Sequence, residues 1–322
     1  MRALMVGAVI AGMVLVALPG VAGADEGGAP ALPARADVGP MRHIWQSLNN
    51  CGPAAVVMAL STLGVDADQE TARLALRGAD VRRGMGPGGV DPWVNGLYGL
   101  HSIARMNGTV ELVKRLVANG FAPMVTQWMQ DPSVSRIAHW RTVRAYDDAS
   151  GVFYVNDSML GAGVPLSYEW FEANWQPFSY RWMVIYAPAD EQRLRDVVGP
   201  EWSESVMRDR FYARTKADAF KQDTSAAWLA YAEASYQDGW FAEAVAAFDR
   251  GMALGSVNGV FTVRTSYPLA LRALGRAQEA DGAAARLAST TSTPATVNIE
   301  PDGFAVMLAT RRATPFDANR PN

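Results

Sequence analysis

Cysteine and histidine are nearly absent from this sequence, which has one cysteine, Cys51, and three histidines in 322 residues. One cysteine excludes an internal disulfide, and the scattered histidines have no spacing typical of a zinc site. Blocks of basic residues are also missing, and the net charge is −3, so no nucleic-acid-binding face is expected. The glycine-rich segment 84–89 lacks the lysine of a phosphate-binding loop. We therefore predict no metal, no cofactor and no nucleic-acid partner.

The one long apolar run stands at the N-terminus and has the order of a secretory signal. Arg2 precedes apolar residues 3–18, and a helix-breaking Pro-Gly pair is followed by small residues that end at Ala24. We predict a signal peptide over 1–24, cleaved near Ala24, and a secreted or periplasmic protein. An uncleaved membrane anchor is the alternative. No later stretch is long and apolar enough to cross a bilayer, so no stable membrane span is expected in the mature chain.

Helix and strand patterns mix in the first half of the remaining chain. Residues 25–40 are rich in Gly, Ala and Pro and are expected to form a flexible linker. Apolar residues then recur at helical spacing over 51–63, and Gly64 follows as a C-terminal cap. This mixture predicts an α+β domain over 41–188. Within it we expect a second helix over 109–118 and strands over 121–128, 138–146, 152–156 and 181–186.

Strand patterns vanish after residue 188, and Ala, Glu, Arg and Gln dominate. Trp228, Gly239, Ala244 and Phe248 follow the spacing of a tetratricopeptide repeat, and a weaker match recurs thirty-six residues later. We predict an all-α tetratricopeptide-like domain over 189–288. An ordinary helical hairpin is the alternative. The Ser-, Thr- and Pro-containing residues 289–322 are expected to form a linker and a poorly ordered tail.

Cys51 stands at the start of the first predicted helix, where a thiol can become a nucleophile. A helix N-terminus offers partial positive charge and unpaired N–H groups, both of which favour the thiolate. A histidine base, an acceptor that orients this histidine, and a donor for the developing oxyanion complete such a site. The alternative interpretation of Cys51 is a small residue of the core.

The predicted hairpin supplies a base and its orienter. His139 begins one strand, Asp157 ends the returning strand, and reflection about Ala149 places residue 139 opposite 159, or opposite 157 if the register slips or bulges. Both side chains then share one face of the sheet, within reach of a hydrogen bond. Gln46 offers its amide, beside the Cys51 N–H, as an oxyanion hole. A surface glutamine and a structural sheet histidine are the alternatives.

Three separated motifs resemble a known family. Gln46 followed by Asn-Cys-Gly-Pro-Ala-Ala at 50–55, Ala-His-Trp at 138–140 and Tyr-Val-Asn-Asp at 154–157 are similar to bacteriocin-processing papain-like cysteine peptidases, cysteine peptidase family thirty-nine. The resemblance implies a papain-like fold, in which a cysteine-bearing helix packs on an antiparallel sheet. It also implies a Cys51, His139 and Asp157 triad with Gln46 in the oxyanion hole.

Ser158 departs from this family, which often has proline after the aspartate, and we expect the difference to matter little for chemistry. Exporter-linked members of the family cut leader peptides after a double glycine, but no transporter follows here, so that specificity is not carried over.

We therefore predict an exported cysteine peptidase that hydrolyses a peptide or related amide bond. Its partners would be a peptide or protein substrate and a protein bound by the helical repeats. The alternative function is a non-catalytic, papain-like module that binds a peptide, with the repeats as an adaptor. A third option is another acyl chemistry on the same residues, such as cell-wall amide cleavage or transamidation.

Overall fold

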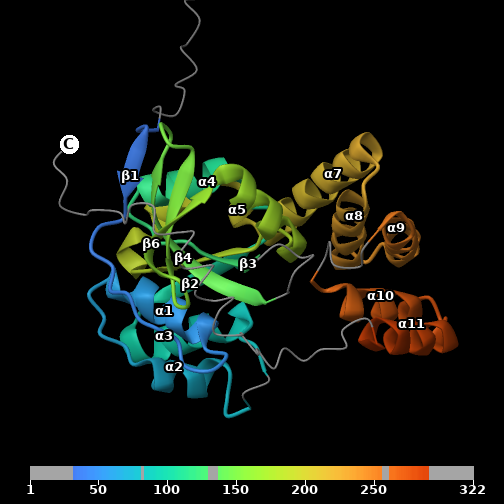
Figure 1. The fold of residues 1–322 in the computed structure, drawn as a ribbon, viewed down its shortest axis with the longest axis horizontal. Helices are drawn as coiled ribbons and strands as arrows, with labels where there is room; N and C mark the ends of the chain where they lie inside the picture. Colours follow the sequence, from blue (N-terminus) through green and yellow to red (C-terminus); the bar gives the residue numbers. More distant parts are fainter. Residues whose placement is uncertain (1–31, 81–82, 130–136, 256–260, 290–322) are drawn as a thin grey trace, which may run out of the picture. The chain divides into compact units, whose positions relative to one another are not determined.

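A computed structural model describes residues 32–80, 83–129, 137–255 and 261–289 of the chain (Figure 1). The predicted signal peptide over 1–24 lies outside these residues, as do the first part of the predicted linker and the predicted tail after residue 289.

The strands of the described residues form one seven-stranded antiparallel sheet. Its strand order is β2-β7-β3-β4-β5-β6, and β1 pairs with the C-terminal end of β4. A mixed chain with such a sheet confirms the predicted α+β class. The strands are β1 (Arg35–Asp37), β2 (His101–Arg105), β3 (Met124–Trp128), β4 (Ala138–Asp147), β5 (Val152–Asp157), β6 (Gly161–Ser167) and β7 (Trp182–Tyr186).

Helices cover both faces of this sheet, and each face has its own hydrophobic core. One core joins α1 (Cys51–Ser61), α2 (Gln69–Leu76) and α3 (Val90–Tyr98) to side chains such as Trp140 and Met183. The other joins α4 (Val110–Ala118) and α5 (Tyr168–Trp175) to side chains such as Val143 and Trp182. Figure 1 shows the two groups of helices on opposite sides of the sheet.

The helix that starts at Cys51 is buried on all sides. Residues 52–60 of α1 are all buried, because their small and apolar side chains can meet the sheet on one side and α2 on the other. A helix that is apolar all round belongs in a core. The helix ends at Ser61, two residues before the end of the predicted helix over 51–63. Gly64 follows with a positive φ of 75°. The predicted helix and α1 both begin at Cys51, so the thiol lies at the N-terminus of the core helix.

The β4–β5 hairpin has one irregularity. Near the turn, Tyr146 pairs with Phe153, but farther away Thr142 pairs with Asn156, so the register shifts between Val143 and Ala145. Arg144 is therefore an extra residue on β4, a β-bulge. The register beyond the bulge is the one obtained by reflection about Ala149.

The C-terminal part is all-helical, as predicted. The pair α8 and α9 buries Ala244 and Phe248 completely, and Gly239 turns between them with a φ of 78°. Trp228 is half-buried, packs against the same core and contacts the ring of Phe220. The tetratricopeptide character itself stays a prediction. The helices are α6 (Glu191–Val198), α7 (Glu204–Gln222), α8 (Ser225–Gln237), α9 (Phe241–Leu254), α10 (Val263–Ala273) and α11 (Ala277–Ser289).

The helical part shares a core with the sheet. Met207 and Phe211 of α7 and Ala234 of α8 belong to the same buried cluster as the sheet residues Val143 and Trp182. The predicted boundary at residue 188 is thus crossed by apolar packing. Within the described residues, no helix has both the length and the apolar character needed to span a membrane.

Gly108 marks a point where the backbone passes close to two tryptophans. A Cβ added there would overlap the indole of Trp175 and lie 2.9 Å from Cδ1 of Trp182, both of which are fully buried. We expect Gly108→Ala to lower the free energy of unfolding by about 1–3 kcal/mol, as overpacking does. Urea denaturation measures this change.

Gly96→Ala is the matched control for Gly108→Ala, because Gly96 lies inside α3 with no atom near its missing Cβ. Alanine is the better helix former, so this control should be neutral or stabilising by up to about 1 kcal/mol. Equal effects of the two substitutions would contradict the packing argument.

Candidate active site

Cys51 is the first residue of α1, and its free thiol is half-buried. The N-cap residue Asn50 makes no capping hydrogen bond through its side chain. Pro53 occupies the first turn, where the helix requires no N–H donor. The remaining N–H groups of this turn have no partners within the helix, so they and the helix dipole favour negative charge beside Cys51.

The ionisation of Cys51 is shifted toward the thiolate. Burial by itself raises the pKa of the thiol, but the His139 imidazole outweighs this effect, with help from the N–H groups of Trp140 and Gly52. The net result is a pKa below the ordinary value of 9.0. A lowered pKa on an accessible thiol is typical of a nucleophilic cysteine.

Gly52 makes room for the neighbouring loop. A Cβ at this position would lie 2.7 Å from Cβ of Met85. The Met85 carbonyl also accepts a hydrogen bond of 3.2 Å from Nε1 of Trp140, which follows His139 on β4. The loop thus links the start of α1 to the strand that bears the histidine. The glycine after Cys51 is therefore required by packing.

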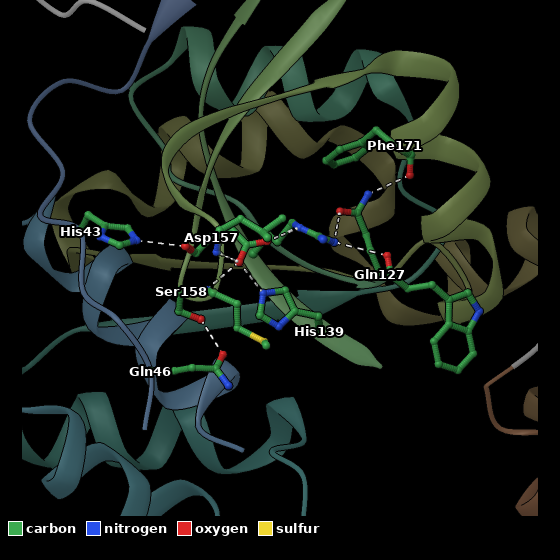
Figure 2. Close-up of polar contacts among 11 residues, drawn as sticks. His43, Gln46, Gln127, His139, Asp157, Ser158 and Phe171 are labelled. Carbon is green, nitrogen blue, oxygen red and sulfur yellow. Dashed lines mark hydrogen bonds and ion pairs between the residues drawn. The ribbon is translucent and has the colours of Figure 1, made fainter. Parts of the chain in front are cut away.

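His139 lies at the start of β4 and is fully buried. Its Nε2 lies 2.9 Å from Oδ1 of Asp157 (Figure 2). Its Nδ1 is buried and has no hydrogen-bond partner of ordinary geometry among the described residues, which leaves this nitrogen for the Cys51 thiol. Burial lowers the pKa of His139, but the negative charge of Asp157 and the contact with Cys51 raise it to about 9.

Asp157 ends β5 and is also fully buried. Besides His139, its Oδ1 accepts hydrogen bonds from the backbone N–H groups of Met159 at 2.8 Å and Leu160 at 3.0 Å. Burial raises the pKa of this carboxyl, but the charges of His139 and Arg141 hold it well below its usual range. Asp157 is therefore a carboxylate at neutral pH.

The hairpin register brings these two side chains together. Because Thr142 pairs with Asn156, continuing the ladder sets Arg141 opposite Asp157, with His139 as the diagonal neighbour on the same face. This is the geometry expected from reflection about Ala149. The structure thus brings Cys51, His139 and Asp157 together, and their catalytic roles stay predictions.

Gln46 is hydrogen-bonded to Ser158, the residue after Asp157. Its backbone N–H donates to the Ser158 carbonyl at 3.0 Å, and the Ser158 hydroxyl donates to its Oε1 at 2.8 Å. Figure 2 shows the amide nitrogen of Gln46 on the side away from Ser158. Ser158 is buried, with 1% of its surface exposed. The serine at this position, where the resemblance often implies proline, supplies the hydroxyl that donates to the Gln46 amide oxygen.

Sequence reasoning missed Arg141 and Gln127, which are both fully buried beside Asp157. Arg141 donates from Nε to Asp157 Oδ2 at 2.8 Å and from Nη1 to Gln127 Oε1 at 3.2 Å. The signal for Arg141 was its position two residues after His139, which puts it on the same face of the strand. Gln127 is far away in sequence, and no motif marks it.

The second histidine near the site has a structural contact. Nε2 of His43 lies 2.9 Å from the carbonyl oxygen of Asp157 (Figure 2). This contact and the Gln46–Ser158 pair fasten the segment before α1 to the end of β5. In the part of the chain that the structure describes, no group of three or more His, Cys, Asp or Glu side chains could hold a metal ion.

Part of the chain is similar to a known protein family. Residues 36–183 match the model of the Peptidase_C39 like family. No curated protein matches the chain.

Several solved structures are similar. One is the crystal structure of a Bacillus anthracis protein assigned as a C39-like peptidase, with 12% identity over 47% of this chain and 96% of that chain and a TM-score of 0.41. A double glycine motif protease from an AMS/PCAT transporter, in complex with the leader peptide, has 17% identity over 46% and 92% and a TM-score of 0.36. The peptidase domain of Streptococcus ComA, a bi-functional ABC transporter involved in quorum sensing, has 14% identity over 46% and 99% and a TM-score of 0.36.

The family match covers Gln46, Cys51, His139 and Asp157, and it confirms the resemblance drawn from the three sequence motifs. Over residues 36–183 this chain is similar to the Peptidase_C39 like family.

Proposed function

We propose that this chain is an exported cysteine peptidase that hydrolyses a peptide or related amide bond through Cys51, His139 and Asp157. The observation that carries the proposal is the buried His139–Asp157 hydrogen bond of 2.9 Å, with the other ring nitrogen left for a thiol of lowered pKa. The match of residues 36–183 to the Peptidase_C39 like family model supports the same activity.

In the proposed mechanism each nitrogen of His139 has its own task. Nε2 donates to Asp157, so the carboxylate holds the ring in one orientation. Nδ1 takes the proton of the Cys51 thiol and forms a thiolate–imidazolium pair. The thiolate attacks the carbonyl carbon, and Nδ1–H returns the proton to the leaving amine. Water then hydrolyses the thioester, with Nδ1 as the base.

The oxyanion that forms in each step requires hydrogen-bond donors. The backbone N–H of Cys51 stands in the first turn of α1, where helix geometry gives it no internal partner. The Gln46 amide is the second proposed donor. Its oxygen is already held by the Ser158 hydroxyl, so its NH₂ group is the end free to meet an oxyanion. A donor already oriented in this way need not reorganise during the reaction.

The remaining proposals concern export and partners. Residues 1–24 would direct the chain to the periplasm or the medium, and the all-helical residues 189–288 would bind a protein partner or a segment of the substrate. A peptide or protein substrate follows from the proposed chemistry.

Alkylation by iodoacetamide tests whether Cys51 is an activated nucleophile. At pH 7 the wild-type thiol should react about tenfold faster than an ordinary cysteine, since a few per cent of unperturbed thiol is ionised there. His139→Ala should remove this advantage and shift the pH at half-maximal rate upward. Stopped alkylation followed by mass spectrometry measures both quantities on the single cysteine.

His101→Ala is the matched control for the alkylation experiment, because His101 lies on β2 beside Asp91 and outside the site. It should alkylate as the wild type does. A slow thiol that is indifferent to His139 would favour the non-catalytic peptide-binding module instead.

A further inference from the structure

We propose that Arg141 is a positioning residue that fixes the Asp157 carboxylate and disfavours protonation of His139. It thereby sets the upper end of the pH range in which His139 is protonated. This inference rests on the proposed function. Buried arginines are uncommon, because their charge must be compensated. Arg141 is 0% exposed, and its position beside the proposed triad calls for an explanation.

The two oxygens of Asp157 are divided between two cationic side chains. His139 binds Oδ1 at 2.9 Å, and Arg141 binds Oδ2 at 2.8 Å. The N–H groups of Met159 and Leu160 complete the hydrogen bonds of Oδ1. The carboxylate is therefore held at both oxygens, so rotation that would break the bond to His139 is opposed.

Arg141 is itself held by a second layer of contacts. Its Nη1 lies 3.2 Å from Gln127 Oε1 and 3.4 Å from the Trp128 carbonyl, and Gln127 Nε2 donates to the Phe171 carbonyl at 2.8 Å (Figure 2). Its guanidinium also lies over the Trp170 ring, 5.4 Å from the centroid. The position of Asp157 is thus tied to β3 and α5, two elements that carry no proposed catalytic residue.

The charge of Arg141 has a consequence separate from its hydrogen bonds. An imidazolium at His139 and the guanidinium of Arg141 share one carboxylate in a buried site, and like charges disfavour each other. Among the residues that the structure describes, the charged and titratable groups that face His139 are Cys51 from α1, Asp157 from β5 and Arg141 from its own strand, with His43 beyond the Asp157 backbone. Arg141 is the fixed cation among these groups.

Protonation of His139 can be followed directly. Three histidines are few enough for each ring to be assigned by NMR with His→Ala variants. We expect His139 in the wild type to titrate near pH 9. In Arg141→Met the midpoint should rise by about one pH unit, because a neighbouring cation is gone. Arg141→Lys keeps an amine that can carry the charge, so its midpoint should lie closer to that of the wild type than the midpoint of Arg141→Met does.

Arg144→Met is the matched control, since it removes an arginine of the same strand that pairs with Asp37 instead. It should leave the His139 midpoint unchanged. Arg141→Gln is a second neutral variant that can still donate to Asp157, and it should show the same rise if Arg141→Met does not fold. A His139 midpoint at or below the wild-type value in either folded neutral variant overturns the proposal.

The proposed function has an independent test, because the titration needs no substrate. Hydrolysis that survives Cys51→Ala would refute the peptidase while leaving the effect of Arg141 on His139 measurable. An unchanged midpoint with an inactive Cys51→Ala would refute only the role of Arg141.

Discussion

Cys51→Ala is expected to abolish peptide hydrolysis, by a factor of at least about a thousand, while the domain stays folded. The reason is that no other cysteine in the chain can replace the nucleophile. The thiol is half-buried at the end of a helix rather than in the centre of a core, so removing one sulfur should cost less than about 1 kcal/mol of unfolding free energy. A peptide library read by mass spectrometry under reducing conditions measures the first effect, and thermal unfolding measures the second.

The pH dependence of the wild type provides an internal check on the Cys51 prediction. Hydrolysis should rise with pH as the thiol ionises, below its ordinary pKa of 9.0, and fall again as the His139 imidazolium loses its proton near pH 9. Turnover that survives Cys51→Ala would remove the hypothesis. Cleavage of peptidoglycan but not of peptides would instead favour the related cell-wall chemistry.

Asp157→Ala is expected to lower the free energy of unfolding by about 3–5 kcal/mol, much more than Cys51→Ala. The substitution leaves Arg141 as a buried cation whose carboxylate partner is gone, and it also removes the acceptor for His139 Nε2. Both side chains are 0% exposed, so water cannot take the place of the carboxylate without opening the core.

The expected pH dependence follows from the sign of the Asp157 shift. Its pKa is held below the usual 3.8 in the folded protein, so the ionised carboxylate stabilises the fold fully above that value. The contribution is lost as pH falls from about 4 toward the lower, folded-state pKa. The difference between wild type and Asp157→Ala should therefore shrink in acid. It should also shrink as pH rises from 6.5 toward about 9, because Asp157 raises the pKa of His139 and this stabilisation is lost when His139 loses its proton.

Two variants test whether the unpaired charge of Arg141 causes the stability loss in Asp157→Ala. Adding Arg141→Met to Asp157→Ala removes the stranded cation and should recover part of the stability. Asp148→Ala removes an aspartate of the same hairpin that pairs with Lys114 near the surface, and it should cost less than about 1 kcal/mol. An Asp157→Ala loss no larger than that of Asp148→Ala would contradict the buried-charge argument, and urea denaturation at neutral pH decides it.

Local patterns in the sequence were sufficient to predict the elements that carry the proposed nucleophile and base. The helix at Cys51, the helix with Thr109 as its N-cap and the 138–157 hairpin all have strong signals in consecutive residues, and the structure contains each of them. The strand expected over 121–128 begins only at Met124, because Pro123 cannot donate a hydrogen bond to the ladder.

Other elements were not predicted, because their residues are typical of a different local structure. The strand β6 contains Gly161, Gly163 and Pro165, which normally indicate a turn, and it exists because β5 provides a partner along its length. The network around Arg141 joins side chains from β3, β4 and β5. Burial of an arginine depends on such long-range neighbours, so composition could not reveal it.

The bulge at Arg144 has a consequence for how relatives of this chain can vary. With the register found beside the turn, Asp157 would fall opposite Thr142 and point to the face that His139 does not occupy. One additional residue restores the parity that lets acid and base meet. The amino acids between the turn and His139 can therefore change, but their number cannot. Deletion or insertion of one residue there would place the two side chains on opposite faces of the sheet, even though every sequence motif would be retained.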